Sequence, residues 1–206
     1  MAGILILNGS PRAPRSNSRR YAELFAKASP VPTETVNITR TNHGELCAKA
    51  ARYHDVLLVF PLYADGIPVS LLNFLKSWQD RLPPKKPRIS VLINCGFYEP
   101  EQNDVAVAMI EQFCRRTGCT LGAVLKIGSG EAILDTPFVF LVRRRIRALA
   151  AAVTAGRPRV LQVTMPIPKR LFVAASAVYW ENYGRRSGIS KRQMQSMDIE
   201  PQPPVT

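Results

Sequence analysis

Residues 3–12, Gly3-Ile4-Leu5-Ile6-Leu7-Asn8-Gly9-Ser10-Pro11-Arg12, form a short apolar run that ends abruptly in small polar residues. Arg15-Ser16-Asn17-Ser18 follow, and an amphipathic helical pattern begins at residue 19. This order predicts a buried strand, a loop rich in hydroxyl and N–H groups, and the start of a helix. Unpaired N–H groups at a helix start stabilise a phosphate. The stretch therefore predicts a phosphate-binding loop rather than a helix cap alone.

The loop has neither of two common nucleotide-binding patterns. It lacks G-x-x-x-x-G-K-[ST], which supplies the lysine and the magnesium-binding hydroxyl of nucleoside triphosphate sites. It also lacks G-x-G-x-x-G, whose glycines let a helix approach a pyrophosphate. Gly128-Ser129-Gly130 follows a late predicted strand, but position 133 is Ile where the third glycine would fall. The hydroxyl and amide groups that remain suit a terminal monophosphate, which favours FMN over NAD.

Three polar loops each follow a predicted apolar strand, and their residues are the candidate cofactor-binding set. The first loop holds Ser10, Arg12, Ser16, Asn17 and Ser18; the second is Pro61-Leu62-Tyr63-Ala64-Asp65-Gly66; the third is Asn94-Cys95-Gly96-Phe97-Tyr98-Glu99. In this order they resemble the phosphate loop and two flavin loops of the flavodoxin-like NAD(P)H-dependent FMN oxidoreductases. The resemblance covers residues 1–130 well and the remainder loosely. Many relatives carry G-S-x-R-x-x-S in the first loop, where this chain has Arg15 in the last place.

The resemblance implies bound FMN, NAD(P)H as reductant, and a small flat acceptor such as a quinone, a nitro compound or a flavin, in a ping-pong reaction. It also implies that backbone amides of residues 62–66 and 95–98 meet the flavin ring, while Tyr63, Phe97 and Tyr98 line the pocket. No catalytic side chain is required, because the cofactor carries the chemistry. Two other functions stay open: a flavodoxin-like electron carrier, and a redox-responsive binding module that uses its basic residues.

Alternating apolar strands and helices predict an α/β fold with a doubly wound parallel sheet. We expect five strands, at residues 3–8, 34–39, 55–60, 88–94 and 121–127, in the flavodoxin order 2-1-3-4-5. Helices are expected at residues 17–28, 44–53, 68–82, 101–117, 136–154 and 169–187. In this order the three loops gather at the carboxyl edge of the sheet, where open α/β sheets bind ligands.

Composition and cysteine spacing are typical of a cytoplasmic protein. The 206 residues are 46% hydrophobic, enough for one sizeable core, and no apolar run is long enough to span a membrane. Cys47, Cys95, Cys114 and Cys119 lack C-x-x-C spacing, and neither His43 nor His54 has a partner ligand nearby in sequence. We therefore expect no metal, and we interpret Cys95 as a small buried residue rather than a redox thiol.

The positive charge is concentrated in the last third of the chain. The net charge is +13, and residues 143–206 alone hold twelve basic and three acidic side chains. Arg143, Arg144 and Arg147 share a helical face, which we interpret as a solvated surface. An acidic partner, an anionic membrane, nucleic acid or attraction of the anionic nicotinamide cofactor stays an alternative.

Three segments are expected along the chain. Residues 1–156 form the FMN-binding domain, residues 157–196 a helical extension, and residues 197–206 a disordered tail. Leu171, Ala175, Val178 and Tyr179 mark an apolar stripe in the extension, with Trp180 and Tyr183 beside it. The stripe predicts packing on the domain or on a partner in a homodimer.

Overall fold

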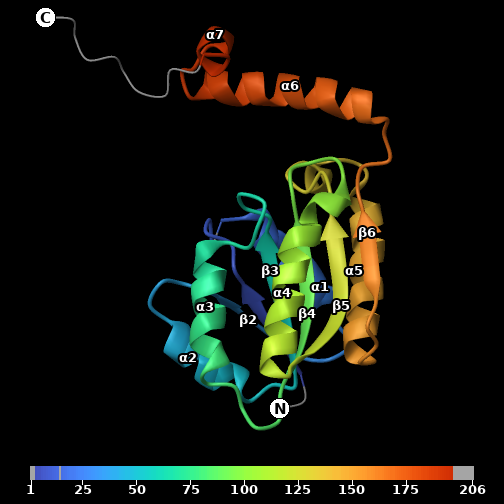
Figure 1. Ribbon diagram of the computed structural model, residues 1–206. Coiled ribbons are helices and arrows are strands. Elements are labelled where there is room, and N and C mark those ends of the chain that lie inside the picture. The colour runs from blue at the N-terminus through green and yellow to red at the C-terminus, as the bar shows by residue number, and fades with distance from the viewer. Residues whose placement is uncertain (1–2, 14, 197–206) are drawn as a thin grey trace, which may run out of the picture. The chain divides into compact units, whose positions relative to one another are not determined.

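The computed structural model describes residues 3–13 and 15–196. These residues divide after Met165 into two compact units. The first unit is built on a six-stranded sheet in the order β2-β1-β3-β4-β5-β6, and every neighbouring pair is parallel (Figure 1). The strands are β1 Ile4–Asn8, β2 Thr33–Asn37, β3 Asp55–Pro61, β4 Arg88–Asn94, β5 Thr120–Ile127 and β6 Val160–Val163.

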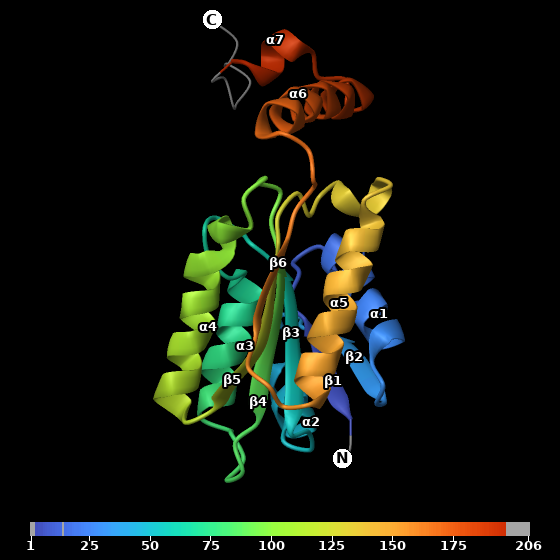
Figure 2. The ribbon, with the colours of Figure 1, turned by 90° about the vertical axis from the view of Figure 1, so that its right-hand side faces the viewer.

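Helices cover both faces of this sheet. Figure 2 shows α1 and α5 on one side of the strands and α3 and α4 on the other, and α2 packs beside α3. The five helices are α1 Asn17–Ala28, α2 His43–Ala50, α3 Val69–Gln79, α4 Asp104–Thr117 and α5 Val139–Thr154. Two short 3₁₀ turns, η1 Pro100–Asn103 and η2 Ile133–Asp135, precede α4 and α5.

The apolar strands are buried on both faces, as the sequence pattern predicts. All five residues of β1 are buried, and so are residues 56–60 of β3. The largest fully buried side chains include Trp78, Tyr21 and Phe25. A strand covered on both sides has no solvent-facing position for polar residues, so the strands read as continuous Val, Ile and Leu runs.

The expected fold and strand order are confirmed for the first five strands, but the sheet has a sixth. Val124–Ile127 of β5 pairs in parallel with Val160–Val163 of β6. The FMN-binding domain was expected to end at residue 156, and the pairing extends the first unit to Met165 instead. β6 is a short edge strand, and its burial alternates because α5 packs on one of its faces. The expected disordered tail, residues 197–206, lies outside the described residues.

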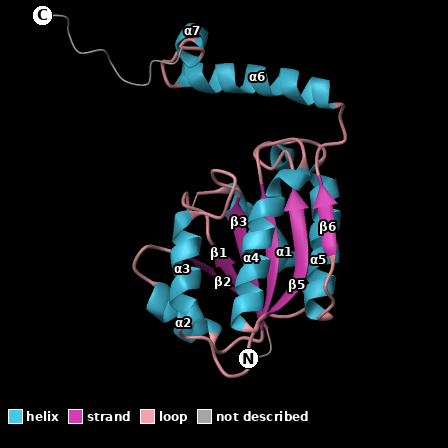
Figure 3. Ribbon diagram, viewed as in Figure 1, coloured by secondary structure: helices cyan, strands magenta, loops and turns pink. Residues whose placement is uncertain are grey.

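The second unit, from Pro166 onwards, contains α6 Lys169–Arg186 and α7 Lys191–Met194 (Figure 3). Ser190 and Gln193 form a capping box at the start of α7. Gly184 is the single buried residue described in α6, and Leu171, Val178 and Trp180 are exposed. No helix within residues 3–13 and 15–196 is both long enough and apolar enough to cross a membrane.

Candidate functional site

The first loop of the site turns sharply at the end of β1. Gly9 donates its N–H to the carbonyl of Val59 (2.9 Å), and a Cβ on Gly9 would lie 3.2 Å from Cβ of Leu71. Ser10 is buried; its N–H donates to Asn8 Oδ1 (3.1 Å), and its Oγ accepts from the N–H of Arg12 (3.3 Å). These contacts hold the loop in a fixed shape ahead of α1.

The start of α1 offers donors for an anion. Ser16 is the N-cap, and its Oγ accepts from the N–H of Arg19 (3.2 Å). No acceptor in the described part of the chain meets the N–H groups of Asn17 and Ser18. Arg12 and Arg15 are exposed and line the same cavity. Free N–H groups, the positive end of the helix dipole and two guanidinium groups together suit a phosphate.

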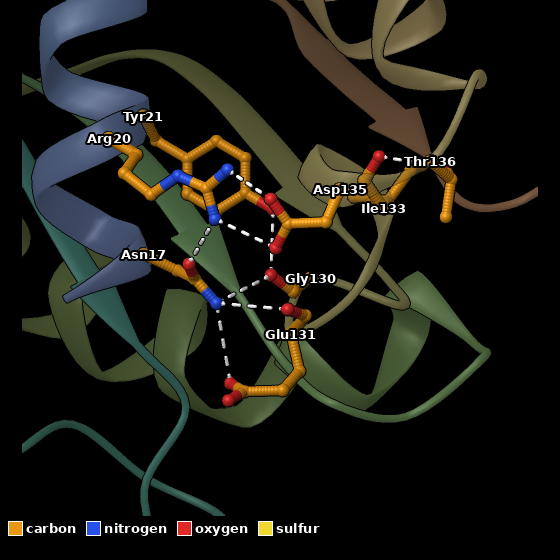
Figure 4. A network of polar contacts seen from close by, with 8 residues as sticks. All are labelled: Asn17, Arg20, Tyr21, Gly130, Glu131, Ile133, Asp135 and Thr136. Carbon is orange, nitrogen blue, oxygen red and sulfur yellow. Dashed lines mark hydrogen bonds and ion pairs between the residues drawn. The ribbon is translucent and has the colours of Figure 1, made fainter. Parts of the chain in front are cut away.

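The side chain of Asn17 has a structural role that its position in the phosphate loop did not predict. Figure 4 shows its Nδ2 donating to the carbonyls of Gly130 (3.3 Å) and Glu131 (3.1 Å), while Tyr21 Oη also donates to Gly130 (2.9 Å). Arg20 donates to Asn17 Oδ1 (3.1 Å) and to both carboxylate oxygens of Asp135. α1 therefore clamps the loop that follows β5, and Asn17 can offer an anion its N–H group rather than its side chain.

Two pKa values reflect this network. The hydrogen bonds from Arg20 hold the pKa of Asp135 below its ordinary value. Burial raises the pKa of Tyr21, so its phenol stays protonated and keeps its hydrogen bond to Gly130. Neither group is placed to exchange protons with a bound molecule, and both act on the shape of the site.

The second loop is a two-residue hairpin. Tyr63 and Gly66 exchange both backbone hydrogen bonds (3.0 and 3.1 Å), and the central residues Ala64 and Asp65 have φ angles of +47° and +56°. Such turns favour Asn-Gly, because both central residues are left-handed. The glycine in this loop lies one position after the left-handed pair. Ala64 therefore stores backbone strain next to Tyr63, which lines the cavity and is 58% exposed.

Ala64→Gly is expected to raise the free energy of unfolding by about 1 kcal/mol, because a left-handed alanine costs roughly 1–2 kcal/mol and glycine avoids that cost. Urea denaturation followed by circular dichroism measures the change. Ala132→Gly is the matched control, since Ala132 has an ordinary φ of −115° and glycine there should slightly destabilise the chain. A lower free energy of unfolding in Ala64→Gly would contradict the interpretation that the backbone of Ala64 is strained.

The third loop is joined to the other two. Asn94 Oδ1 accepts from Ser18 Oγ (3.1 Å), and the Asn94 carbonyl accepts from the N–H of Leu62 (2.8 Å). Burial raises the pKa of the Cys95 thiol, and Asn103 Nδ2 donates to its sulfur (3.3 Å). A protonated, buried thiol is a poor nucleophile, which supports the interpretation of Cys95 as a packing residue.

A fourth loop, residues 128–131, belongs to the site, although the sequence analysis rejected its Gly128-Ser129-Gly130 as a dinucleotide motif and gave the loop no other role. Gly130 donates its N–H to the carbonyl of Cys95 (2.7 Å), and Glu131 lines the cavity. A Cβ on Gly130 would lie 2.9 Å from Cβ of Asn94, and one on Gly128 would lie 2.4 Å from the carbonyl oxygen of Tyr98. Gly128-Ser129-Gly130 is thus no dinucleotide motif; its glycines allow close packing on the third loop. Two glycines directly after an apolar strand were the signal for it.

These loops enclose a cavity of about 730 Å³ at the carboxyl edge of the sheet, within the size range of small-molecule sites. The predicted residues that line it are Ser10, Arg12, Ser16, Asn17, Ser18, Pro61, Leu62, Tyr63, Asn94, Cys95 and Gly96. Residues that line it without having been predicted are Pro11, Arg15, Arg19, Arg20, Glu23 and Glu131. The remaining predicted residues, Ala64, Asp65, Gly66, Phe97, Tyr98 and Glu99, are outside this lining.

Within the described ranges, no group of three or more His, Cys, Asp or Glu side chains is arranged to hold a metal ion. All four cysteines are free and buried. The donors that the cavity offers are mostly N–H groups, hydroxyls and guanidinium groups, a set that suits a phosphate.

No family model matches the sequence, and no curated protein matches it significantly. In structure, the chain matches a flavodoxin of Streptococcus pneumoniae over 75% of its own length and 99% of the flavodoxin, with 16% identity and a TM-score of 0.56. The fold is flavodoxin-like. The chain also matches the larger rubredoxin oxygen:oxidoreductase of Desulfovibrio gigas, and it covers 35% of the length of that protein.

Two enzymes share this fold with the chain. An FMN-dependent NADH-azoreductase of Bacillus anthracis, solved with FMN, matches with 14% identity over 74% of this chain and 99% of the enzyme, with a TM-score of 0.58. An NAD(P)H:quinone oxidoreductase of Methanothermobacter marburgensis matches with 16% identity over 72% and 94%, with a TM-score of 0.56. At these identities the similarity establishes the flavodoxin-like fold.

Proposed function

We propose that this flavodoxin-like protein binds FMN in the large cavity and uses NAD(P)H to reduce a small flat acceptor such as a quinone, a nitro compound or a flavin. The observation that carries the proposal is the cavity itself, which combines an anion site at the start of α1 with the second and third loops in one 730 Å³ space. The FMN-dependent NADH-azoreductase and the NAD(P)H:quinone oxidoreductase that share this fold support it.

The residues present fit FMN. Ser10, the N–H groups of Asn17 and Ser18, and the guanidinium groups of Arg12 and Arg15 would hold the terminal phosphate. No motif for an adenosine half accompanies them, which favours FMN over FAD. When bound there, FMN would supply the redox chemistry that links the oxidation of NAD(P)H to the reduction of the acceptor.

The hydrogen bonds of the loops narrow the choice of groups that face the ring. The N–H groups of Leu62, Tyr63, Gly66 and Cys95 already donate to backbone carbonyls. Gly96 lines the cavity, and no acceptor among the described residues meets its N–H group. We propose that this N–H group contacts the flavin ring, while Tyr63, which lines the cavity, covers the ring and excludes water. Phe97 lies outside the lining and is 53% exposed, so it would have to turn toward the ring to cover it.

The absorption spectrum of the purified protein, followed by extraction and identification of the chromophore, tests the cofactor. Steady-state oxidation of NADH and NADPH with an added quinone tests the reaction. A flavin spectrum without turnover would favour the electron carrier. The net charge of +13 speaks against a carrier, because such proteins typically have acidic surfaces. Protein free of flavin after reconstitution with FMN would refute the proposal.

Ping-pong kinetics is expected, because NAD(P)H and the acceptor would occupy the same exposed face of the flavin in turn. Double-reciprocal plots at several fixed quinone concentrations should be parallel. Intersecting plots, together with a ternary complex seen in product-inhibition patterns, would show two separate faces. Menadione and a nitroaromatic acceptor should give the same pattern, because both would take up electrons at the same face of the flavin.

We propose that the second unit is covered either by the first unit or by a second copy in a homodimer, and that it does not bind nucleic acid. Its exposed Leu171, Val178 and Trp180 would each contribute roughly 1.5–3 kcal/mol when fully buried. Truncation before Pro166 should therefore lower the melting temperature or abolish the dimer in size-exclusion chromatography with light scattering. Removal of residues 197–206 alone is the control.

A truncated protein that is equally stable and monodisperse, but has lost salt-sensitive binding to DNA or anionic vesicles, would reverse this assignment.

The four free cysteines support a cytoplasmic location for the chain, which we also propose.

A further inference from the structure

A second cavity of about 640 Å³ lies next to the first, between the first loop and the starts of α2 and α3. Ser10, Pro11 and Tyr63 line both cavities. The two cavities are therefore neighbours across the first two loops. The proposed FMN site does not require the second cavity.

The charge of the second cavity is one-sided. Arg40 and His43 are among its lining residues, and none of those residues is Asp or Glu. The first cavity, in contrast, contains Glu23 and Glu131 as well as its arginines. No ion pair is recorded for Arg40 with any residue that the structure describes, so its charge is available to a ligand.

Two helix starts without a side-chain cap add to this charge. Asn42 precedes α2, but its side chain accepts from the N–H of Thr39 (2.9 Å) and donates to the carbonyl of Asn37 (2.9 Å). Pro68 precedes α3 and has no side-chain donor or acceptor with which to cap it. α3 has no acidic residue in its first turn, so its positive end faces the cavity that Ser70 lines without compensation, whereas Glu45 in the first turn of α2 partly offsets the positive end beside His43.

Two buried polar atoms in the cavity wall lack a partner. His43 Nε2 and Ser70 Oγ are inaccessible, and each is without a hydrogen bond. A buried polar group left unsatisfied costs about 1–3 kcal/mol. Both residues line the cavity, so a ligand there would give these two atoms partners once the side chains rotate toward it. Ile38, Pro68 and Val69 form an apolar part of the wall, and Asn37, Thr39 and Asn73 add uncharged polar groups.

We propose that the second cavity binds an aromatic organic anion, with its anionic group at Arg40, His43 and the starts of α2 and α3 and its flat part against the apolar wall. This inference rests on the proposed function, under which the anion is either the phosphate-bearing adenylate half of NAD(P)H or an acidic acceptor. Either ligand would place its anionic group beside the proposed flavin cavity, and Tyr63 lines both cavities.

Titration calorimetry on the full-length protein, with and without FMN, tests the site without measuring turnover. The probes are 2′,5′-ADP, adenosine and 2-naphthoate. We expect at least one anion to bind, adenosine to bind at least tenfold more weakly than 2′,5′-ADP if the nucleotide is the ligand, and Arg40→Gln to weaken the anion at least tenfold. Arg116→Gln, which removes an exposed arginine of α4 outside both cavities, should leave binding unchanged.

The affinity of each anion for Arg40→Gln distinguishes the two sources. Weaker binding of 2′,5′-ADP to this variant supports the nucleotide half as the ligand. Weaker binding of 2-naphthoate alone supports an acidic acceptor. Equal binding to Arg40→Gln and to the original protein, or no anion binding at millimolar concentration, would overturn the proposal. Because calorimetry does not require NAD(P)H oxidation, failure of the proposed enzymatic function leaves this result interpretable. Ser70→Ala, which removes one orphaned atom, should weaken the same anion with the fold intact.

Discussion

Gly128→Ala is expected to destabilise the protein by about 3 kcal/mol and to disrupt the flavin cavity. The added Cβ would lie 2.4 Å from the carbonyl oxygen of Tyr98 and 3.0 Å from the backbone nitrogen of Pro100. Backbone atoms cannot rotate away, so the third loop must shift, and overpacking of this kind costs about 1–3 kcal/mol or more. The melting temperature should fall by roughly 6–12 °C in a thermal scan. FMN retention, measured by absorbance after gel filtration, should fall with it.

Gly44→Ala is the matched control, because a Cβ at Gly44 would meet nothing within 4 Å. Gly44 lies in α2, where alanine is the better helix former, so stability should stay equal or rise slightly. A Gly128→Ala protein with the original melting temperature and flavin content would mean that the fourth loop does not support the third.

Replacing Ser16, Asn17 and Ser18 together by alanine is expected to lower FMN affinity at least about 100-fold, equivalent to about 2.8 kcal/mol. The change removes the N-cap of α1, which alone contributes about 1 kcal/mol. It also removes the Asn17 contacts to residues 130–131 and the Ser18 bond to Asn94. The donors of the phosphate site would then no longer be held in place. Fluorescence titration of apoprotein with FMN measures the loss.

Ser29→Ala is the control for this triple variant. Ser29 is the C-cap at the opposite end of α1, and its Oγ donates to the carbonyl of Val31 (2.8 Å). It should retain the original FMN affinity. If the triple variant does not fold, Ser16→Ala alone should still weaken FMN binding. Unchanged affinity in the triple variant would mean that the phosphate is held elsewhere.

Much of the site was predictable because its signals are local. A buried parallel strand must be apolar throughout, and a polar loop must follow it at the edge of the sheet, so β1, β3 and β4 and their loops are visible in the chain itself. The right-handed crossover rule then brings these loops together. For this reason, the predicted residues of the first loop all line one cavity.

Other features depend on contacts between distant segments. β6 has four residues and gains its structure by pairing with β5, so no local pattern distinguished it from the extension. Likewise, Asn17 reads as a phosphate-loop residue, yet its side chain reaches residues 130–131, more than a hundred positions away. Sequence spacing carries no information about such contacts.

By itself, the sequence determined the positions of the first five strands and of the three predicted loops, because strand burial and helix starts follow from short-range patterns of apolar, hydroxyl and glycine residues. The expected strand order came from the resemblance to the flavodoxin-like family. Only the tertiary structure decided which groups remain free to bind. In the folded chain, the side chains of Asn17 and Ser18 form internal hydrogen bonds, and Ala64 has a left-handed backbone conformation. His43 Nε2 and Ser70 Oγ have no hydrogen-bond partner beside the second cavity. Hydrogen-bond partners, backbone strain and cavities depend on the packing of segments far apart in sequence, and that packing exists only in the folded chain.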